Sequence, residues 1–192
     1  MKMMSKYPFE VVSIRLVRDA PLMSKAPILK PQDAVKLVGD ELCELDREVL
    51  CVINRRADGV PINCSIVSIG ALDESLAHPR EIMKSAILAN AASLIMVHNH
   101  PSGKLSPSKH DTIVTERMIQ VCELMGITLD DHIIVGGDNS QYFSFREKEL
   151  LNYTPLTFNT DYMQVEFASP KVAENQEEPS QETPKRVSYR RR

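Results

Sequence analysis

Residues 98–111 read HNHPSGKLSPSKHD, and this stretch decides both the predicted fold and the candidate site. The apolar run 93–97 just before it predicts a buried central strand. Pro101 predicts that this strand stops and gives way to a loop. Ser108 is a favourable N-cap residue, so we expect a helix over 108–125. A strand end, a short loop and a helix start are therefore expected to meet within one short segment.

Two histidines of this stretch, His98 and His100, lie two residues apart at the strand end. Because strand side chains alternate with a period of 2, both rings leave the same face, roughly 6–7 Å apart along the chain. Asp111 falls in the first turn of the predicted helix, where its carboxylate can reach back over the strand end. Two imidazole nitrogens and one carboxylate oxygen are typical of a catalytic zinc site with one open position. Iron or manganese can accept the same ligands, and we prefer Zn²⁺ because it supports hydrolysis without redox chemistry.

The same residues also have interpretations that involve no chemistry. A pair of strand-end histidines can bond to backbone groups without any metal. Ser108 and Asp111 have the spacing of a capping box, although Ser108 can cap the helix and still donate its hydroxyl proton. We expect His110 to be solvated at the helix start. His132 either supports the site or lines the substrate cleft, or it is a core-edge histidine with satisfied ring nitrogens.

Metal-assisted hydrolysis also needs a general base, which must be a carboxylate outside the ligand set. The candidates from the residues alone are Glu44, Glu48, Glu74 and Glu81. Glu81 has another explanation, because an acid in the first turn of a helix interacts favourably with the helix dipole. Glu48 is slightly favoured because it stands at the head of an apolar strand, where a carboxylate has no packing role. A surface carboxylate at a strand end remains the alternative for Glu48.

The rest of the chain predicts alternating strands and helices. We expect strands over 9–17, 48–54, 60–69, 133–135 and 142–145, helices beginning at Pro31 and Pro79, and a short helix over 146–151. This order predicts an α/β domain with three layers, a mixed sheet flanked by helices. The expected divisions are an N-terminal strand and loop at 1–27, the main domain at 28–152, an extension at 153–167 and a disordered tail at 168–192.

Composition and charge favour a soluble intracellular domain. With 43% hydrophobic and 26% charged residues, the 192-residue chain can bury a core, and no apolar run is long enough to cross a bilayer. The start of the chain has no signal-peptide pattern, so we expect a cytoplasmic protein and no membrane partner. The cysteines, none in a C-x-x-C pair, are expected to be free thiols: Cys43, Cys51, Cys64 and Cys122. Basic residues gather at 185–192, which we expect to be solvated, with contact to nucleic acid or an acidic partner as the alternative.

The string H-N-H-P-S-G, followed by P-S-x-x-D, resembles the RadC family of the JAMM/MPN metalloprotease superfamily. The superfamily pattern is a Glu, then H-x-H-P, six residues, Ser, two residues and Asp. Every spacing after the Glu matches at His98, His100, Ser108 and Asp111. The strings H-P-R-E-I at 78–82 and D-H-I-I-V-G at 131–136 are also similar to RadC. The resemblance covers roughly residues 28–152.

This resemblance implies a cytidine-deaminase-like α/β fold and a zinc ion that activates water. It implies hydrolysis of an amide or isopeptide bond in a peptide substrate. It assigns the general base to Glu48, and it implies that the Ser108 hydroxyl donates to the oxyanion that forms on the attacked carbonyl. Asn99 departs from the Ser or Thr that many JAMM peptidases carry between the histidines.

Full-length RadC proteins carry a helix-hairpin-helix segment ahead of this domain, and we do not expect one here. The alternative function is a metal-binding interaction module of DNA repair or of mobile elements, able to contact DNA and without peptidase activity. Nuclease action is a third hypothesis. Salt-dependent DNA binding separates the second hypothesis from the first, and DNA cleavage that requires Glu48 separates the third.

Overall fold

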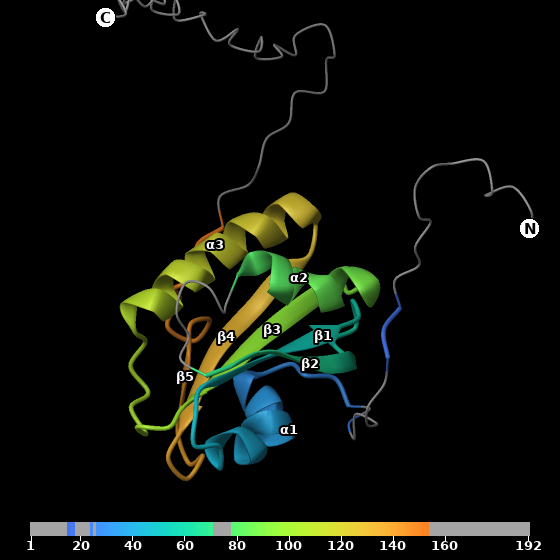
Figure 1. Cartoon of the computed structure of the whole chain (residues 1–192). Helices are drawn as coiled ribbons and strands as arrows, with labels where there is room; N and C mark the ends of the chain where they lie inside the picture. Colours follow the sequence, from blue (N-terminus) through green and yellow to red (C-terminus); the bar gives the residue numbers. More distant parts are fainter. Residues whose placement is uncertain (1–14, 18–23, 25, 71–77, 154–192) are drawn as a thin grey trace, which may run out of the picture. The chain divides into compact units, whose positions relative to one another are not determined.

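A five-stranded mixed sheet forms the middle layer of the computed structural model, which describes residues 15–17, 24, 26–70 and 78–153 (Figure 1). In the order β2-β1-β3-β4-β5, the strands are β2 Pro61–Ile69, β1 Val49–Arg55, β3 Ser93–His100, β4 Thr128–Gly136 and β5 Tyr142–Ser144. The helices are α1 Pro31–Cys43, α2 Pro79–Leu88 and α3 Lys109–Met125. The α/β prediction with a mixed sheet is thereby confirmed.

Helices cover both faces of the sheet, with α1 on one side and α2 and α3 on the other (Figure 1). The alternation along β3 shows how the two cores divide. Leu94 and Met96 join the apolar cluster of α2 and α3, whereas Ile95 and Val97 join the cluster of α1. Because side chains on a strand alternate between faces, the histidines that follow continue onto the α3 side. This places the candidate ligands between the sheet and α3.

The pairing of β3 with its neighbours sets what lies beside the histidines. β1 runs antiparallel to β3 with Leu50 opposite His98, and β4 runs parallel to β3 with Ile134 opposite His98. Every residue of β1 is buried, since this strand lies between two others and under helices on both faces. The candidate site therefore lies against two buried central strands, β1 and β3.

The first turns of the helices carry the expected start signals. Pro31 is the first residue of α1, where a missing N–H costs nothing. The carboxylate of Asp33 accepts hydrogen bonds from the backbone of Leu29 and Lys30, both at 3.0 Å. Gly126 ends α3 in the left-handed conformation with φ of 66°, which a residue without Cβ adopts readily.

Two expectations near the end of the domain are wrong. β4 begins at Thr128 rather than 133, because the buried polar residue Asp131 finds partners in Ser144 and the backbone of Arg146. The helix expected over 146–151 is absent, and residues 145–149 form turns. Glu149 adopts a positive φ of 56°, which a continuing right-handed helix does not allow.

Other predictions concern residues that lie mostly outside the described part of the chain. The strand expected over 9–17 lies outside the described residues except for 15–17, which form no strand. Most of the 153–167 extension and all of the 168–192 tail also lie outside them. Among the residues that are described, no helix is long and apolar enough to span a bilayer.

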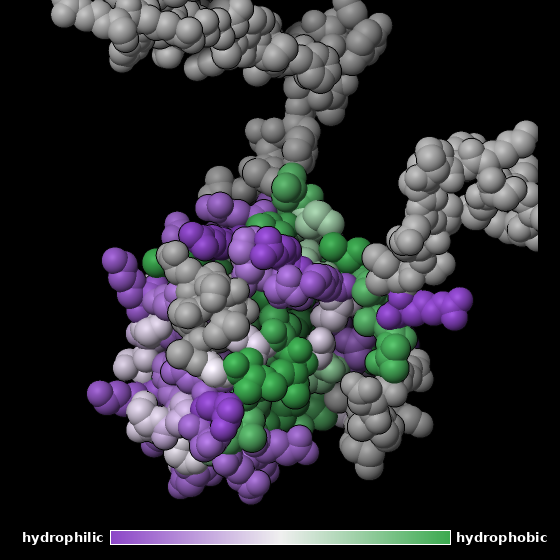
Figure 2. Space-filling model, viewed as in Figure 1, coloured by the Kyte–Doolittle hydropathy of each residue, from purple (hydrophilic) through white to green (hydrophobic). Residues whose placement is uncertain are grey.

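The face drawn in Figure 2 is largely polar, with apolar side chains gathered near its centre. The edge strand β2 carries two exposed apolar side chains, Ile66 and Ile69. At the end of β3, in contrast, polar side chains are buried: His98, Asn99 and His100. Buried polar groups need partners, and the partners of these three side chains lie on the elements that flank the end of β3.

Candidate metal centre

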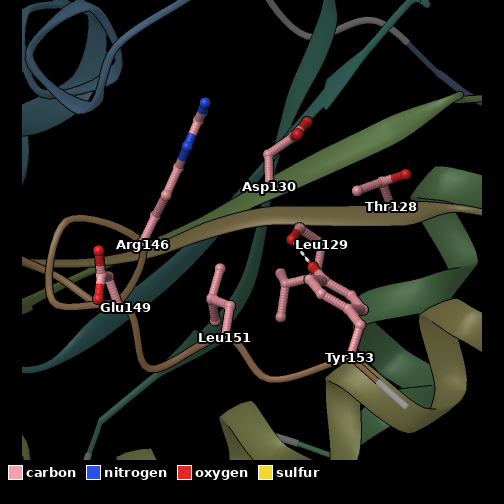
Figure 3. A pocket seen from close by; sticks show the side chains of 7 residues that line it. All are labelled: Thr128, Leu129, Asp130, Arg146, Glu149, Leu151 and Tyr153. Atoms are coloured by element: carbon pink, nitrogen blue, oxygen red, sulfur yellow. Dashed lines mark hydrogen bonds between the residues drawn. The ribbon is translucent and has the colours of Figure 1, made fainter. Parts of the chain in front are cut away.

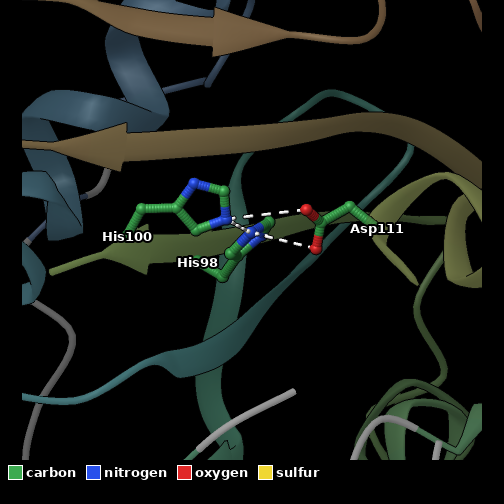
Figure 4. Close-up of side chains that lie close together, drawn as sticks. All are labelled: His98, His100 and Asp111. Carbon is green, nitrogen blue, oxygen red and sulfur yellow. Dashed lines mark hydrogen bonds and ion pairs between the residues drawn. The ribbon is translucent and has the colours of Figure 1, made fainter. Parts of the chain in front are cut away.

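The end of β3 and the start of α3 bring His98, His100 and Asp111 together (Figure 4). Their ligand atoms all lie within 4.8 Å of one another. His98 Nε2 lies 3.0 Å from His100 Nε2 and 3.3 Å from Asp111 Oδ1, and His100 Nε2 lies 3.5 Å from Asp111 Oδ2. The predicted convergence of two imidazoles and one carboxylate is confirmed. These three residues can hold a metal ion.

A capping box holds Asp111 in place. The backbone N–H of Ser108 donates to Asp111 Oδ2 at 2.6 Å, and the backbone N–H of Asp111 donates to Ser108 Oγ at 3.1 Å. The structural interpretation of this pair is therefore correct. One oxygen of the carboxylate is shared with the helix start, while the other faces His98. The catalytic role expected for Ser108 stays a prediction, because its hydroxyl still has a proton to donate.

The ring of His100 presents a lone pair to the cluster. Its Nδ1 lies 2.6 Å from the carbonyl oxygen of Lys104, which can only accept, so Nδ1 carries the proton and donates. In the neutral ring Nε2 is then an acceptor, and it faces the acceptor oxygens of Asp111. The lone pair of His100 Nε2 and the oxygens of Asp111 therefore face one another with no proton between them, and a cation placed there would bind both. This donor set fits a divalent cation such as zinc.

The pKa values of the three candidate ligands are shifted by burial and by one another. Only the protonated ring of His100 can donate from Nε2 to Asp111, and that hydrogen bond raises the pKa of His100 above its ordinary value, against the effect of burial. Burial by itself would raise the pKa of Asp111, but His100, His98 and Ser108 together bring the pKa well below its usual range. Burial lowers the pKa of His98 far below its usual range. The cluster thus holds a carboxylate and a neutral imidazole ready for a metal ion.

Behind His98 lies a second layer that the sequence indicated only in part. His98 Nδ1 lies 2.9 Å from His132 Nε2, and His132 Nδ1 lies 2.6 Å from Thr115 Oγ1. The two interpretations offered for His132 coincide, because both of its ring nitrogens are satisfied and one of the partners is the candidate ligand His98. Burial lowers the pKa of His132 to about 4, so this ring is neutral. Thr115 was missed, although its position four residues after Asp111 puts both on one face of α3.

Glu48 lies at the head of β1, directly before Val49. Continuing the antiparallel register from Leu50 and His98 by two residues places Glu48 opposite His100. Because side chains alternate, Glu48 shares the face of Leu50, which is the face of His98 and His100. The charge of Glu48 contributes to the raised pKa of His100. Its role as a general base stays a prediction.

The other candidates of the sequence lie elsewhere. Glu44 is exposed at the end of α1, and Glu81 pairs with Lys84 in the first turn of α2. Glu74 lies outside the described residues. His110 is less solvated than expected: its side chain is partly buried, and its Nε2 has no hydrogen-bond partner within the described part of the chain.

A cavity of about 260 Å³ lies at the other end of β4 (Figure 3). Its lining residues include Thr128, Asp130 and Tyr153. The candidate ligand His100 lies beside Gly136, at the far end of the same strand. Six to eight strand residues separate the two places, which corresponds to about 20–26 Å. The cavity is therefore separate from the candidate metal centre.

Comparison with known proteins agrees with the fold and the cluster. Residues 28–150 match the RadC-like JAB domain family. A UPF0758 protein of Clostridium perfringens is 42% identical over 129 residues, which cover 67% of this chain and 56% of that protein. A UPF0758 protein of Streptococcus gordonii is 44% identical over 121 residues, which cover 63% and 53% of the two chains. One of Methanosarcina acetivorans is 40% identical over 124 residues, which cover 65% and 53%.

The mixed sheet and its His-His-Asp cluster define an α/β domain of the JAB type with a candidate metal site. The chain belongs to the RadC-like JAB domain family. It spans about half the length of the curated relatives it matches. The names of these three relatives state no activity, so the reaction has to be argued from the site.

Proposed function

We propose that this domain is a zinc-dependent hydrolase that cuts amide or isopeptide bonds. The observation that carries the proposal is the cluster of His98, His100 and Asp111, whose ligand atoms lie within 4.8 Å of one another. Two imidazoles and one carboxylate carry a single negative charge, so a zinc ion held there would keep net positive charge. Such an ion polarises a carbonyl and lowers the pKa of a water molecule from 15.7 to about 7.

Glu48 is the general base in this proposal. Its carboxylate takes the proton from the attacking water and passes it to the leaving nitrogen. Support comes from the strand register, which continues from Leu50 and His98 to bring Glu48 alongside His100. This register puts the carboxylate on the face of the sheet that carries both ligand histidines, yet outside the ligand set, which is where a general base is needed.

Ser108 assists by stabilising the charge that develops on the substrate. Its Oγ accepts from the backbone of Asp111 at 3.1 Å and retains its own proton for donation. A hydroxyl next to a ligand carboxylate can donate to the oxyanion of the attacked carbonyl. Ser108→Ala should therefore lower kcat by about 10²–10³, the range found for removal of one oxyanion donor.

The first experiment measures metal content and cleavage in the same preparations. Wild-type protein should hold near-stoichiometric zinc, and His98→Ala and Asp111→Ala should lose it. Cleavage is followed with an unbiased set of peptides and isopeptide-linked peptides. Absence of zinc from the wild-type protein, or zinc that persists in both variants, would contradict the proposal.

The second experiment separates the base from the ligands. Glu48→Gln should retain zinc and lose hydrolysis, because an amide cannot take up the proton. Glu44→Gln is the matched control: it makes the same change at an exposed carboxylate a few residues away. Equal activity in Glu48→Gln and wild type would remove Glu48 from the mechanism.

The alternative is a metal-binding interaction module that contacts DNA without cutting peptides. The basic residues gathered at 185–192 are the feature that favours it. Salt-dependent DNA binding that persists after zinc is removed, with no peptide cleaved, would support this alternative. If binding disappears with deletion of residues 185–192 alone, the domain itself has no part in it.

A further inference from the structure

A continuous set of buried hydrogen bonds joins two of the candidate ligands on the side away from the metal position. It runs from His98 Nδ1 to His132 Nε2 at 2.9 Å and from His132 Nδ1 to Thr115 Oγ1 at 2.6 Å. The Thr115 hydroxyl then donates to the backbone carbonyl of Asp111 at 2.6 Å. All four residues are at most 2% exposed, so water does not compete for these bonds.

The backbone carbonyl of Asp111, at one end of this set, determines which group donates in each hydrogen bond. The carbonyl of Asp111 can only accept, so the single proton of the Thr115 hydroxyl points toward it. The Thr115 oxygen then accepts, and His132 Nδ1 must be the donor. A neutral ring with its proton on Nδ1 has a lone pair on Nε2, which accepts from His98 Nδ1. His98 therefore carries its proton on Nδ1.

We propose that His132 and Thr115 are positioning residues that keep His98 in the tautomer whose Nε2 lone pair faces the metal cluster. The inference rests on the proposed function, because it concerns the same cluster. His98 Nε2 lies 3.3 Å from Asp111 Oδ1 and 3.0 Å from His100 Nε2, so a proton on that nitrogen would occupy the place of a metal ion. Hydrogen-bond partners of ligating histidines commonly have this orienting role.

The two ligand histidines are oriented by different kinds of acceptor. His100 Nδ1 donates to the backbone carbonyl of Lys104, which no side-chain substitution removes. His98 depends on side chains, since its orientation is set by a hydroxyl two hydrogen bonds away. The orientation of His98 can therefore be changed by substitution at Thr115 without replacing any of the three ligands.

Thr115 is a sharper test position than His132. The ring of His132 stacks on Phe145 with centroids 5.0 Å apart and planes 9° apart, so its removal also disturbs packing. Thr115→Val keeps the branched shape and removes only the hydroxyl. Thr115→Ser keeps the hydroxyl and removes only a methyl group. The pair separates the hydrogen bond from the packing.

Zinc affinity is the first readout, measured on the full chain by competition with a chromophoric chelator at one pH. Thr115→Val should bind zinc about 10–100-fold more weakly than wild type. Thr115→Ser should stay within about 3-fold of wild type, because it retains the hydroxyl that defines the direction of the bonds. Thermal unfolding of the zinc-free proteins is recorded alongside. Affinities that are equal in wild type and Thr115→Val, or that fall equally in both variants, would overturn the inference.

The second readout needs no metal. Nitrogen-15 NMR of histidine-labelled, zinc-free protein reports which ring nitrogen of His98 carries the proton. We expect Nδ1 in wild type and Thr115→Ser, and partial or complete transfer to Nε2 in Thr115→Val. A wild-type His98 protonated on Nε2 would refute the inference even if zinc binds. A wild-type protein that binds no zinc but shows His98 protonated on Nδ1 would refute the proposed function and leave the inference standing.

Discussion

The side chain of Asn99 bonds to both peptide groups that flank Glu48. Its Oδ1 accepts from the backbone N–H of Val49 at 2.8 Å, and its Nδ2 donates to the backbone carbonyl of Arg47 at 3.0 Å. Asn99 lies between the two ligand histidines and is buried. One amide thus connects the proposed general base to the strand that carries the ligands, across fifty residues of sequence.

Replacing Asn99 should impair hydrolysis more than metal binding. In Asn99→Ala both peptide groups lose a partner, and the buried N–H of Val49, left unsatisfied, costs about 1–3 kcal/mol of stability. Glu48 then loses its fixed position, so kcat should fall while zinc affinity stays close to wild type. The measurements are kcat, zinc affinity and thermal unfolding.

The matched control for Asn99 is Asn54→Ala. Asn54 is also fully buried in the sheet and bonds through its Nδ2 to Asn63 and Ser85, on β2 and α2. Its loss should lower stability by a similar amount without a selective loss of kcat. Equal losses of kcat in the two variants at matched stability would show that Asn99 has only a structural role.

Zinc should stabilise the folded protein. A ligand that binds only the folded state adds about 2.7 kcal/mol to the free energy of unfolding at 100 times its Kd. The gain should disappear in His98→Ala, which removes a ligand. It should persist in His78→Ala, because His78 is exposed at the start of α2. Urea unfolding with zinc or with a chelator measures this difference, and equal gains in the two variants would argue against the site.

The zinc-free protein should lose stability as the pH falls below 6.5. Burial lowers the pKa of His132 from 6.5 to about 4 and also lowers the pKa of His98. Between pH 6.5 and the lowered pKa values of the folded protein, these two histidines bind protons in the unfolded chain but not in the folded one. A fall in pH therefore favours unfolding. Each such proton lowers the free energy of unfolding by about 1.4 kcal/mol per pH unit.

The raised pKa of His100 acts in the opposite direction. Its contribution to stability is present below pH 6.5 and is lost as the pH rises through the folded pKa. Below pH 6.5 the contribution of His100 no longer changes with pH, so the two histidines with lowered pKa values set the slope there. Urea unfolding between pH 7 and 4.5 in the presence of a chelator tests this. His132→Gln should flatten the slope and the exposed His78→Gln should not; an unchanged slope in His132→Gln would contradict the prediction.

Gly136 should be intolerant of a side chain because β4 passes close to the loop that follows the ligands. A Cβ at this position would lie 3.1 Å from the backbone oxygen of His100 and 3.3 Å from the Cα of Gly103. Both neighbours are backbone atoms, so Gly136→Ala should shift the segment that carries the Lys104 carbonyl. We expect zinc affinity to fall about 10-fold or more, since the orientation of His100 depends on that carbonyl. Zinc affinity equal to that of wild type would show that the loop can move without cost.

The sequence alone determined the parts of the site that depend on local geometry. A period of 2 at the strand end put His98 and His100 on one face, and the N-cap signal at Ser108 put Asp111 in the first helical turn; both are confirmed. Apolar periodicity also predicted α1, α2 and α3. Apolar periodicity failed at Asp131, because this buried polar residue interrupts the apolar pattern in the first half of β4. Its burial depends on partners more than ten residues away in the sequence.

Only the tertiary structure decided which groups surround the ligands. Four glutamates were candidates for the general base, and the antiparallel register of β1 and β3, continued by two residues, places Glu48 opposite His100. The same pairing gave Asn99 its partners, and the approach of α3 to β4 joined Thr115 to His132. Local patterns specify a helix or a strand because they act between near neighbours along the chain. Contacts between segments tens of residues apart arise only when the buried faces of the sheet and helices pack together.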